Sequence, residues 1–248
     1  MFQRVKVGRS ERLATSEYSI KYVVRQCRAR KGLTFFWLYL IIVFDMSVAS
    51  QANYFIERYG YESYLEVGMH RGKTFKCVEC KNKTSVEPAG KKRGGIHPTH
   101  AMTSDEFFLQ NKDTFDIVFI DGLHHADQFM RDVINSLKYL NEGGIIFCHD
   151  INPVRERFQL VPRHPEARAW RGDVWKSWVR LRATRADLRM HTIQSLEDKG
   201  GNALGAIQRG EQELLLLNRN LIDPSYEDLE ANRKKWLNLI TWEEFIKI

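Results

Sequence analysis

Cysteine is scarce in this chain, with four among 248 residues. Four scattered cysteines are too few for a disulfide scaffold in a chain of this length. Cys77 and Cys80 form one C-x-x-C, but no second pair stands at zinc-ribbon spacing, so two thiols on one helix are the favoured interpretation. This usage suits a reducing compartment, and we expect a cytoplasmic protein.

Long apolar runs are also lacking. The longest, residues 33–44 (LTFFWLYLIIVF), ends at Asp45 and is too short to span a bilayer as a helix. The basic stretch before it is too long for the n-region of a signal peptide. A buried helix, a membrane-surface anchor, or sequence upstream of the usual domain are the three interpretations left. We expect residues 1–50 to form an appendage that packs on the domain. The anchor interpretation would bring residues 1–45 into weak contact with a membrane surface.

An excess of one charge is confined to the N-terminus. The chain has 38 basic and 31 acidic residues, and residues 1–33 contain nine of the basic and two of the acidic ones. The rest balances at 29 of each sign, which gives no reason to expect a nucleic-acid partner. With 43% apolar and 28% charged residues, the composition is that of a globular protein and excludes wholesale disorder.

From about residue 51, strand patterns alternate with helix patterns. Strands are predicted at 63–67, 84–87, 115–120 and 145–148, with a brief strand near the end of the loop 88–100. Helices are predicted at 52–59, from about 72, at 105–111 with Ser104 as N-cap, at 125–140 where residues 141–144 end the helix, at 174–184 and at 226–238. An antiparallel pair is predicted at 188–194 and 203–208. This alternation indicates βαβ units and a doubly wound α/β sheet. We expect a domain at 51–210 and a helical extension at 211–248.

A glycine motif follows the first predicted strand. Its spacing is E-x-G-x-x-x-G, with Glu66, Gly68 and Gly72, and differs from the G-x-G-x-x-G of dinucleotide-binding folds. The acid before the turn suits a cationic ligand better than a diphosphate, which disfavours an NAD-dependent oxidoreductase. About twenty residues later, Glu87 ends the second strand, where a carboxylate can accept hydrogen bonds from both hydroxyls of a ribose.

Acids and histidines follow the next two strands. Asp121, His124 and His125 come after FDIVFI, and His149 and Asp150 come after IIFC. Because the carboxyl ends of parallel strands share one edge, these side chains should converge there, with one of the two adjacent histidines facing the site. Carboxylates suit hard divalent cations, and histidine is the usual general base near neutral pH. The alternative is that both acids cap the helices that follow.

Residues about 51–210 resemble the class I S-adenosylmethionine-dependent methyltransferases, especially the small-molecule branch with an I-D-G-x-H motif. The resemblance implies a Rossmann-like seven-stranded sheet, mostly parallel, with an antiparallel C-terminal pair. It also implies S-adenosylmethionine as cofactor, held by residues around its methionine part (Glu66, Gly68, Gly72), its ribose (Glu87) and its adenine (Ser104, Asp105), with Asp121 close by. The segments that carry it are YLEVGMHRGKTF, VEP, TSDEFF, FDIVFIDGLHHADQFMRDVINSLKYLNEGGIIFCHDINP and GDVWKSWVRLR.

Within this family, Asp121, His124 and Asp150 resemble a magnesium-dependent subgroup that acts on sugar hydroxyls, as in macrolide-sugar O-methyltransferases. The resemblance implies His124 as general base, with His125 in reserve. It implies Asp121, His149 and Asp150 as ligands of Mg²⁺, with Asn152 as an alternative to His149. The sequence departs from the subgroup by having His149 where an acid is expected.

The resulting hypothesis is an O-methyltransferase for a small hydroxylated acceptor, such as a sugar or glycoconjugate, assisted by a divalent metal. The alternatives are a metal-independent methyltransferase of unknown acceptor and a cofactor-binding protein without catalysis. The N/D-P-P-Y/F motif typical of methyltransferases for DNA bases is missing after the fourth strand. We expect the loops 88–100 and 151–173 to form the acceptor pocket.

Overall fold

The computed structural model divides into two compact units, Met1–Met46 and Ser47–Ile248. It describes residues 21–22, 42–43 and 47–248, except 92–93, 195–202 and 218–222. In the first unit, β1 (Lys21–Tyr22) pairs antiparallel with β2 (Ile42–Val43). Most of the apolar run 33–44 lies outside the described residues, and so does the predicted packing of the appendage.

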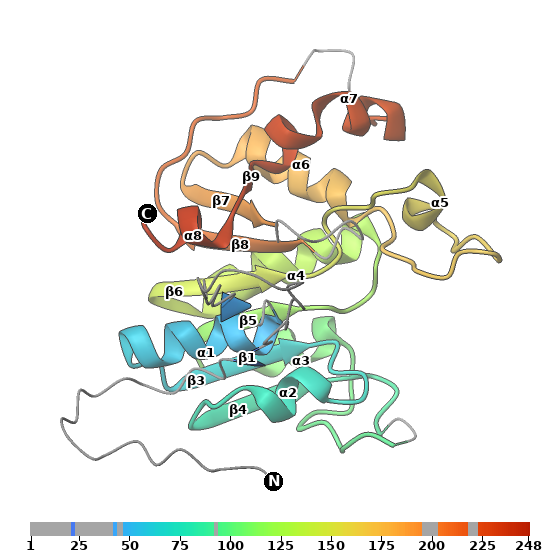
Figure 1. The fold of residues 1–248 in the computed structure, drawn as a ribbon. Coiled ribbons are helices and arrows are strands. Elements are labelled where there is room, and N and C mark those ends of the chain that lie inside the picture. The colour runs from blue at the N-terminus through green and yellow to red at the C-terminus, as the bar shows by residue number, and fades with distance from the viewer. Residues whose placement is uncertain (1–20, 23–41, 44–46, 92–93, 195–202, 218–222) are drawn as a thin grey trace, which may run out of the picture. The chain divides into compact units, whose positions relative to one another are not determined.

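The second unit is built on a seven-stranded sheet of order β4-β3-β5-β6-β8-β7-β9 (Figure 1). Its strands are β3 (Ser63–Val67), β4 (Asn82–Val86), β5 (Phe115–Ile120), β6 (Leu140–Cys148), β7 (Leu188–Ile193), β8 (Leu204–Arg209) and β9 (Leu239–Ile240). Only β8 runs against its neighbours, since it is antiparallel to both β6 and β7 while the other pairings are parallel. The predicted Rossmann-like sheet with an antiparallel C-terminal pair is confirmed.

The core follows the register of these strands. Leu65, Val118, Ile146, Ile207 and Met190 are paired in turn across five strands, and each is 0% exposed. Such a row explains why the central strands are nearly continuous apolar runs, because parallel strands covered by helices are buried on both faces.

Helices cover both faces of the sheet (Figure 1). They are α1 (Val48–Tyr59), α2 (Lys73–Cys77), α3 (Ser104–Gln110), α4 (Ala126–Tyr139), α5 (Glu156–Gln159), α6 (Val174–Thr184), α7 (Tyr226–Leu237) and α8 (Trp242–Phe245). Ile146 belongs to the hydrophobic cluster that includes Phe129 of α4 and Trp178 of α6, whereas Phe147 contacts Phe55 of α1 on the opposite face. Among the described residues, every helix is too short or too polar to cross a bilayer.

Three local predictions are wrong. Thr103, not Ser104, is the N-cap of α3, because Thr103 and Glu106 form a reciprocal capping box. Within 88–100, the described residues form no strand, and only a single bridge joins Val86 to His100, since glycine and proline interrupt the segment. The strand predicted at 145–148 begins earlier, since β6 spans Leu140–Cys148 and includes residues 141–144. The seventh strand is instead β9, which pairs with β7 in the C-terminal part of the unit.

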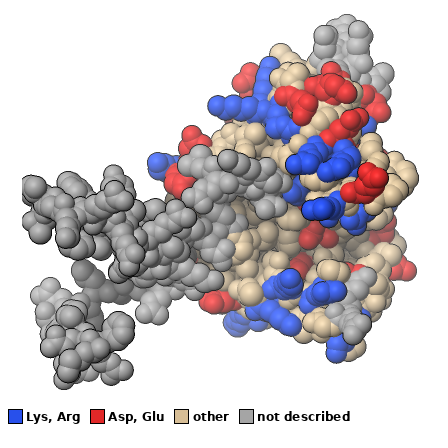
Figure 2. Space-filling view, turned by 45° about the vertical axis from the view of Figure 1, so that its right-hand side comes forward, with Lys and Arg blue, Asp and Glu red and all other residues tan. Residues whose placement is uncertain are grey.

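The charged surface of this unit is mixed. On the face drawn in Figure 2, blue Lys and Arg side chains alternate with red Asp and Glu side chains. This pattern agrees with the balanced charge count of residues 34–248.

Candidate active site

Four side chains meet at the carboxyl ends of β5 and β6, and we refer to them as the acid–histidine cluster: Asp121, His124, His149 and Asp150. Asp121 and His124 lie on the loop between β5 and α4, while His149 and Asp150 directly follow β6. The sequence-predicted convergence on one edge of the sheet therefore matches the geometry of the structure.

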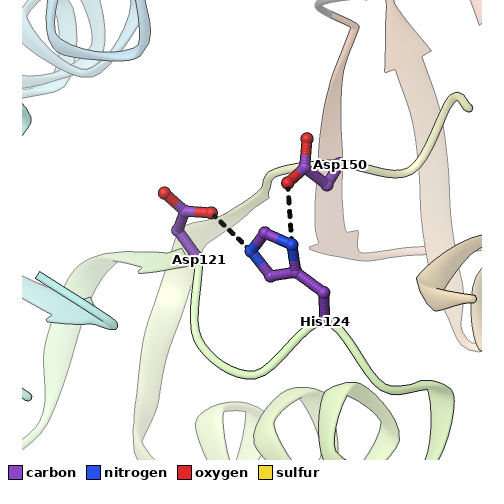
Figure 3. Close-up of side chains that lie close together, drawn as sticks. All are labelled: Asp121, His124 and Asp150. Atoms are coloured by element: carbon purple, nitrogen blue, oxygen red, sulfur yellow. Dashed lines mark ion pairs between the residues drawn. The ribbon is translucent and has the colours of Figure 1, made fainter. Parts of the chain in front are cut away.

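His124 lies between the two carboxylates (Figure 3). Its Nε2 is 3.6 Å from Asp121 Oδ1, and its Nδ1 is 3.3 Å from Asp150 Oδ2. Nδ1 is also 3.0 Å from the carbonyl oxygen of Trp170. Because a carbonyl oxygen only accepts hydrogen bonds, Nδ1 must carry the proton, which leaves Nε2 as the basic nitrogen of the neutral ring.

His149 completes the cluster from the other strand end. Its Nδ1 lies 3.2 Å from Asp121 Oδ1 and 3.3 Å from Asp150 Oδ1. Both contacts are ion pairs, although neither has the direction of a hydrogen bond. His149 therefore faces both acids through one nitrogen.

The members of the cluster shift one another's pKa values. Burial raises the pKa of Asp121, but the nearby imidazoles of His124 and His149 outweigh it and lower that pKa to about 2. Burial lowers the pKa of His149, but the two carboxylates outweigh it and raise that pKa to about 10. The pKa of His124 is also raised, against the effect of burial, by Asp121 and Asp150. At neutral pH, His149 is a cation that offsets the charge of the acids.

Asp150 is held in an uncommon conformation by a buried arginine. Its φ is +59°, in the left-handed region that few non-glycine residues occupy. Its Oδ1 accepts a hydrogen bond from Nη1 of Arg171, and the two residues are only 5% and 6% exposed. Oδ1 of Asp150 is therefore close to Arg171 and His149, while Oδ2 faces His124.

Arg171 belongs to the WRGD segment, residues 170–173. The sequence did not predict that these four residues act together at the site. The ring of Trp170 stacks on His124 at 5.1 Å between centroids. A Cβ at Gly172 would lie 1.6 Å from the carbonyl oxygen of His124, so the two backbones touch. Asp173 accepts a hydrogen bond from Ala126 N at 2.7 Å, at the start of α4. The WRGD segment thus fixes the loop that carries His124. The only sequence signal for this segment is a glycine between two charged residues directly before a helix.

His125 lies apart from the cluster. Its ring contacts Trp170 edge to face at 6.1 Å. It lines a hollow of about 310 Å³ together with Leu123, Arg131 and Val161, and none of the four cluster residues lines that hollow. The geometry thus favours His124 over its neighbour as the histidine of the site.

Glu66 and Gly68 lie at the end of β3, beside the cluster. Glu66 is buried and accepts a hydrogen bond from the hydroxyl of Tyr64 at 2.6 Å, and burial raises its pKa to about 7. A Cβ at Gly68 would lie 2.0 Å from the carbonyl oxygen of Asp121. Gly68 is therefore required by the contact between two strand ends, a role that the sequence motif does not specify.

Glu87 and Gly72 shape the loop that follows. Glu87 accepts hydrogen bonds from His70 N at 2.8 Å and from Ala89 N at 3.2 Å. Gly72 has a φ of +71° at the start of α2. Glu87 thus holds the glycine loop in place, and its role at a ribose stays a prediction.

Ser104 and Asp105 contact α4. Ser104 donates a hydrogen bond to Asp132 at 2.6 Å, and Asp105 forms an ion pair with Arg131 at 3.3 Å. Desolvation raises the pKa of the buried Asp132 to about 6. Both predicted adenine contacts therefore lie beside the buried Asp132. The sequence did not single out Asp132, because its position on α4 looks like that of an ordinary helix residue.

The donor set fits a magnesium ion poorly. Asp121, His124 and Asp150 offer ligand atoms within 4.8 Å of one another. However, Arg171 and His124 already approach the two oxygens of Asp150, and Asn152 gives its side-chain oxygen to Arg233. Two positive unit charges about 4 Å apart repel each other by about 4 kcal/mol near a protein surface. The repulsion between the Arg171 guanidinium and a divalent metal ion at that distance would be twice as large. The ligand set Asp121, His149 and Asp150 stays a prediction.

Comparison with known proteins finds a family model that matches the central part of the unit. Residues 65–151 match the model of a family described as a methyltransferase domain, a range that includes the whole cluster but not the WRGD segment. No curated protein matches the chain.

Solved structures show weaker likenesses. An O-methyltransferase from Bacillus cereus in complex with SAH is 15% identical, with a TM-score of 0.47 over 66% of this chain and 83% of that one. The O-methyltransferase TomG from Streptomyces achromogenes, in complex with SAM, is 12% identical, with a TM-score of 0.47 over 66% and 82%. Likenesses at this level carry no argument about the acceptor.

Proposed function

We propose that this chain carries a class I S-adenosylmethionine-dependent methyltransferase domain and methylates a hydroxyl of a small acceptor with His124 as general base. The observation that carries the proposal is the position of His124. Its Nδ1 is held by the Trp170 carbonyl and by Asp150, so that Nε2 is the nitrogen available to take a proton.

When bound, S-adenosylmethionine supplies a methyl group on a sulfonium, which reacts by in-line displacement. The acceptor oxygen forms the new bond to the methyl carbon as the carbon–sulfur bond breaks, and its proton passes to Nε2 of His124. Asp150 and Asp121 stabilise the resulting imidazolium, since they lie 3.3 and 3.6 Å from its two nitrogens.

The cofactor lies along the carboxyl ends of β3 and β4 in this proposal. The carboxylate of Glu66 faces the ammonium group of the methionine part, and Glu87 accepts from the ribose hydroxyls. Ser104 and Asp105 lie near the adenine. The support for this placement is the order of these residues along the βαβ units, together with the resemblance of their motifs.

The acceptor class rests on sequence resemblance. The segment D-G-L-H around His124 is similar to that of methyltransferases for sugar hydroxyls, and we propose a sugar or glycoconjugate as acceptor. The loop 151–173 forms one wall of its pocket, since the WRGD segment contacts His124 directly.

Transfer is tested with the full chain, methyl-labelled S-adenosylmethionine and a panel of hydroxylated compounds that includes free sugars, nucleotide sugars and phenols. We expect label transfer and S-adenosylhomocysteine formation above the acceptor-free background with at least one sugar-containing compound. Transfer only to an amine would contradict hydroxyl methylation. Cofactor binding without transfer to any compound would favour a protein that has lost catalysis.

A further inference from the structure

The buried guanidinium of Arg171 contacts the acid–histidine cluster. Nη1 of Arg171 contacts Oδ1 of Asp150, and Nδ1 of His124 lies 3.3 Å from Oδ2. We propose that Arg171 is the resident cation of this active site, occupies the charge position that a divalent metal would take, and orients Asp150 towards His124. This inference rests on the proposed function, because it assigns a positioning residue to the same reaction.

The arginine is built into the fold rather than attached to its surface. Its backbone N donates to the carbonyl oxygen of Phe158 at 2.8 Å, and the next residue, Gly172, donates to the same oxygen at 3.2 Å. The side chain is 6% exposed. An exposed arginine could swing away when a metal ion arrives, whereas a buried one anchored at its backbone has little room to move.

The geometry of Asp150 points to the same conclusion. Its left-handed backbone conformation is costly for a side chain other than glycine, and persists only when surrounding contacts hold it. Here those contacts are the guanidinium on one oxygen and the imidazole on the other. A guanidinium stays charged at every physiological pH, so the carboxylate remains paired without a metal.

The consequence is a site that discriminates against divalent cations. Removal of the guanidinium charge should leave Oδ1 of Asp150 without its arginine partner beside the carboxylate of Asp121, and two such carboxylates are a better set of ligands for a divalent ion such as Mn²⁺. The substitution Arg171→Met should therefore create a metal site, while Arg171→Lys should not, because it keeps the charge.

Mn²⁺ titration followed by electron paramagnetic resonance tests this inference on the full chain after EDTA treatment and dialysis. It needs neither cofactor nor acceptor. We expect weak binding by the unaltered protein and at least tenfold tighter binding, at one site, by Arg171→Met. The gain should disappear in the double variant Arg171→Met/Asp150→Asn. The matched control is Arg182→Met, which removes a buried guanidinium bound to the carbonyl oxygens of Lys235 and Trp236 rather than to Asp150, and should gain nothing.

Two results would overturn the inference. One is tight Mn²⁺ binding by the unaltered protein that Asp150→Asn abolishes, which would make the cluster a metal centre. The other is a folded Arg171→Met variant, shown by a cooperative thermal transition, that binds Mn²⁺ no better than the unaltered protein. If Arg171→Met does not fold, Arg171→Gln takes its place. A failure of S-adenosylmethionine to bind would refute the proposed function and leave the Mn²⁺ result unaffected.

Discussion

The proposed cofactor side of the sheet edge, after β3 and β4, and its proposed catalytic side, after β5 and β6, are held together differently. On the cofactor side, Glu66 accepts from Tyr64 of the same strand, and Glu87 accepts from the backbone N–H groups of His70 and Ala89, in the loops after β3 and β4. On the catalytic side, His124 is held by Trp170, 46 residues away, and Asp150 by Arg171, 21 residues away. The proposed catalytic side therefore depends on the WRGD segment, whereas the proposed cofactor side depends on contacts within β3 and between the loops that follow β3 and β4. Substitutions on the two sides should have separable effects.

The largest expected effect belongs to the catalytic side. His124→Ala removes the proposed base and should lower kcat by roughly 10²–10⁴-fold, with cofactor affinity nearly unchanged. The control is His125→Ala, which removes a ring outside the cluster and should change kcat only slightly. Steady-state rates on an acceptor from the panel and calorimetric cofactor binding measure both quantities. Equal losses from the two variants would refute the assignment.

The second prediction concerns the point where the two sides meet. Gly68→Ala would place a methyl group 2.0 Å from Asp121 O in a left-handed conformation. The combined clash and strain should lower the free energy of unfolding by roughly 3–5 kcal/mol. Gly60→Ala is the control, with a similar φ of +68° but nothing within 4 Å, and should cost about 1 kcal/mol. Urea denaturation measures both, and equal losses would contradict the contact.

The third prediction isolates the cofactor side. Glu87→Ala should weaken S-adenosylmethionine binding by about 2–3 kcal/mol, since charge-assisted hydrogen bonds to the ribose are lost. The rate at saturating cofactor should change little. Calorimetry with S-adenosylhomocysteine measures the affinity, and undiminished binding would remove Glu87 from the site.

The smallest expected effect is a change in pH dependence. The general base must be neutral, and Asp121 and Asp150 raise the pKa of His124, so kcat should fall as the pH drops through that raised value. Asp150→Asn removes a negative charge beside the His124 ring. It should shift the acidic limb of the kcat–pH profile to lower pH by roughly one unit. An unshifted limb in the variant would show that another group controls it.

Regular elements of this fold were predictable where local patterns are strong. The strand Phe115–Ile120 and the helix Val174–Thr184 were both predicted to the residue, because a continuous apolar run and a helical spacing mark them. The strand Leu239–Ile240 was missed, since two residues carry no periodic signal and their pairing with β7 is a tertiary contact.

The candidate active site could likewise be predicted from the sequence only in part. Asp121, His124 and Asp150 were predicted to converge because carboxyl ends of neighbouring parallel strands meet at one edge. Trp170 and Arg171 were missed because an irregular segment has no period that would place its side chains. Their contacts with His124 and Asp150 depend on how residues 151–173 fold back over the sheet edge.

Equilibrium binding of S-adenosylmethionine to the full chain tests the central claim most directly. Calorimetric titration should give a dissociation constant in the micromolar range, about −7 to −8 kcal/mol. NAD, titrated under the same conditions, should not bind, because the E-x-G-x-x-x-G loop places an acid where a diphosphate would lie. Absence of S-adenosylmethionine binding by the folded chain, or equally tight binding of NAD, would contradict the account.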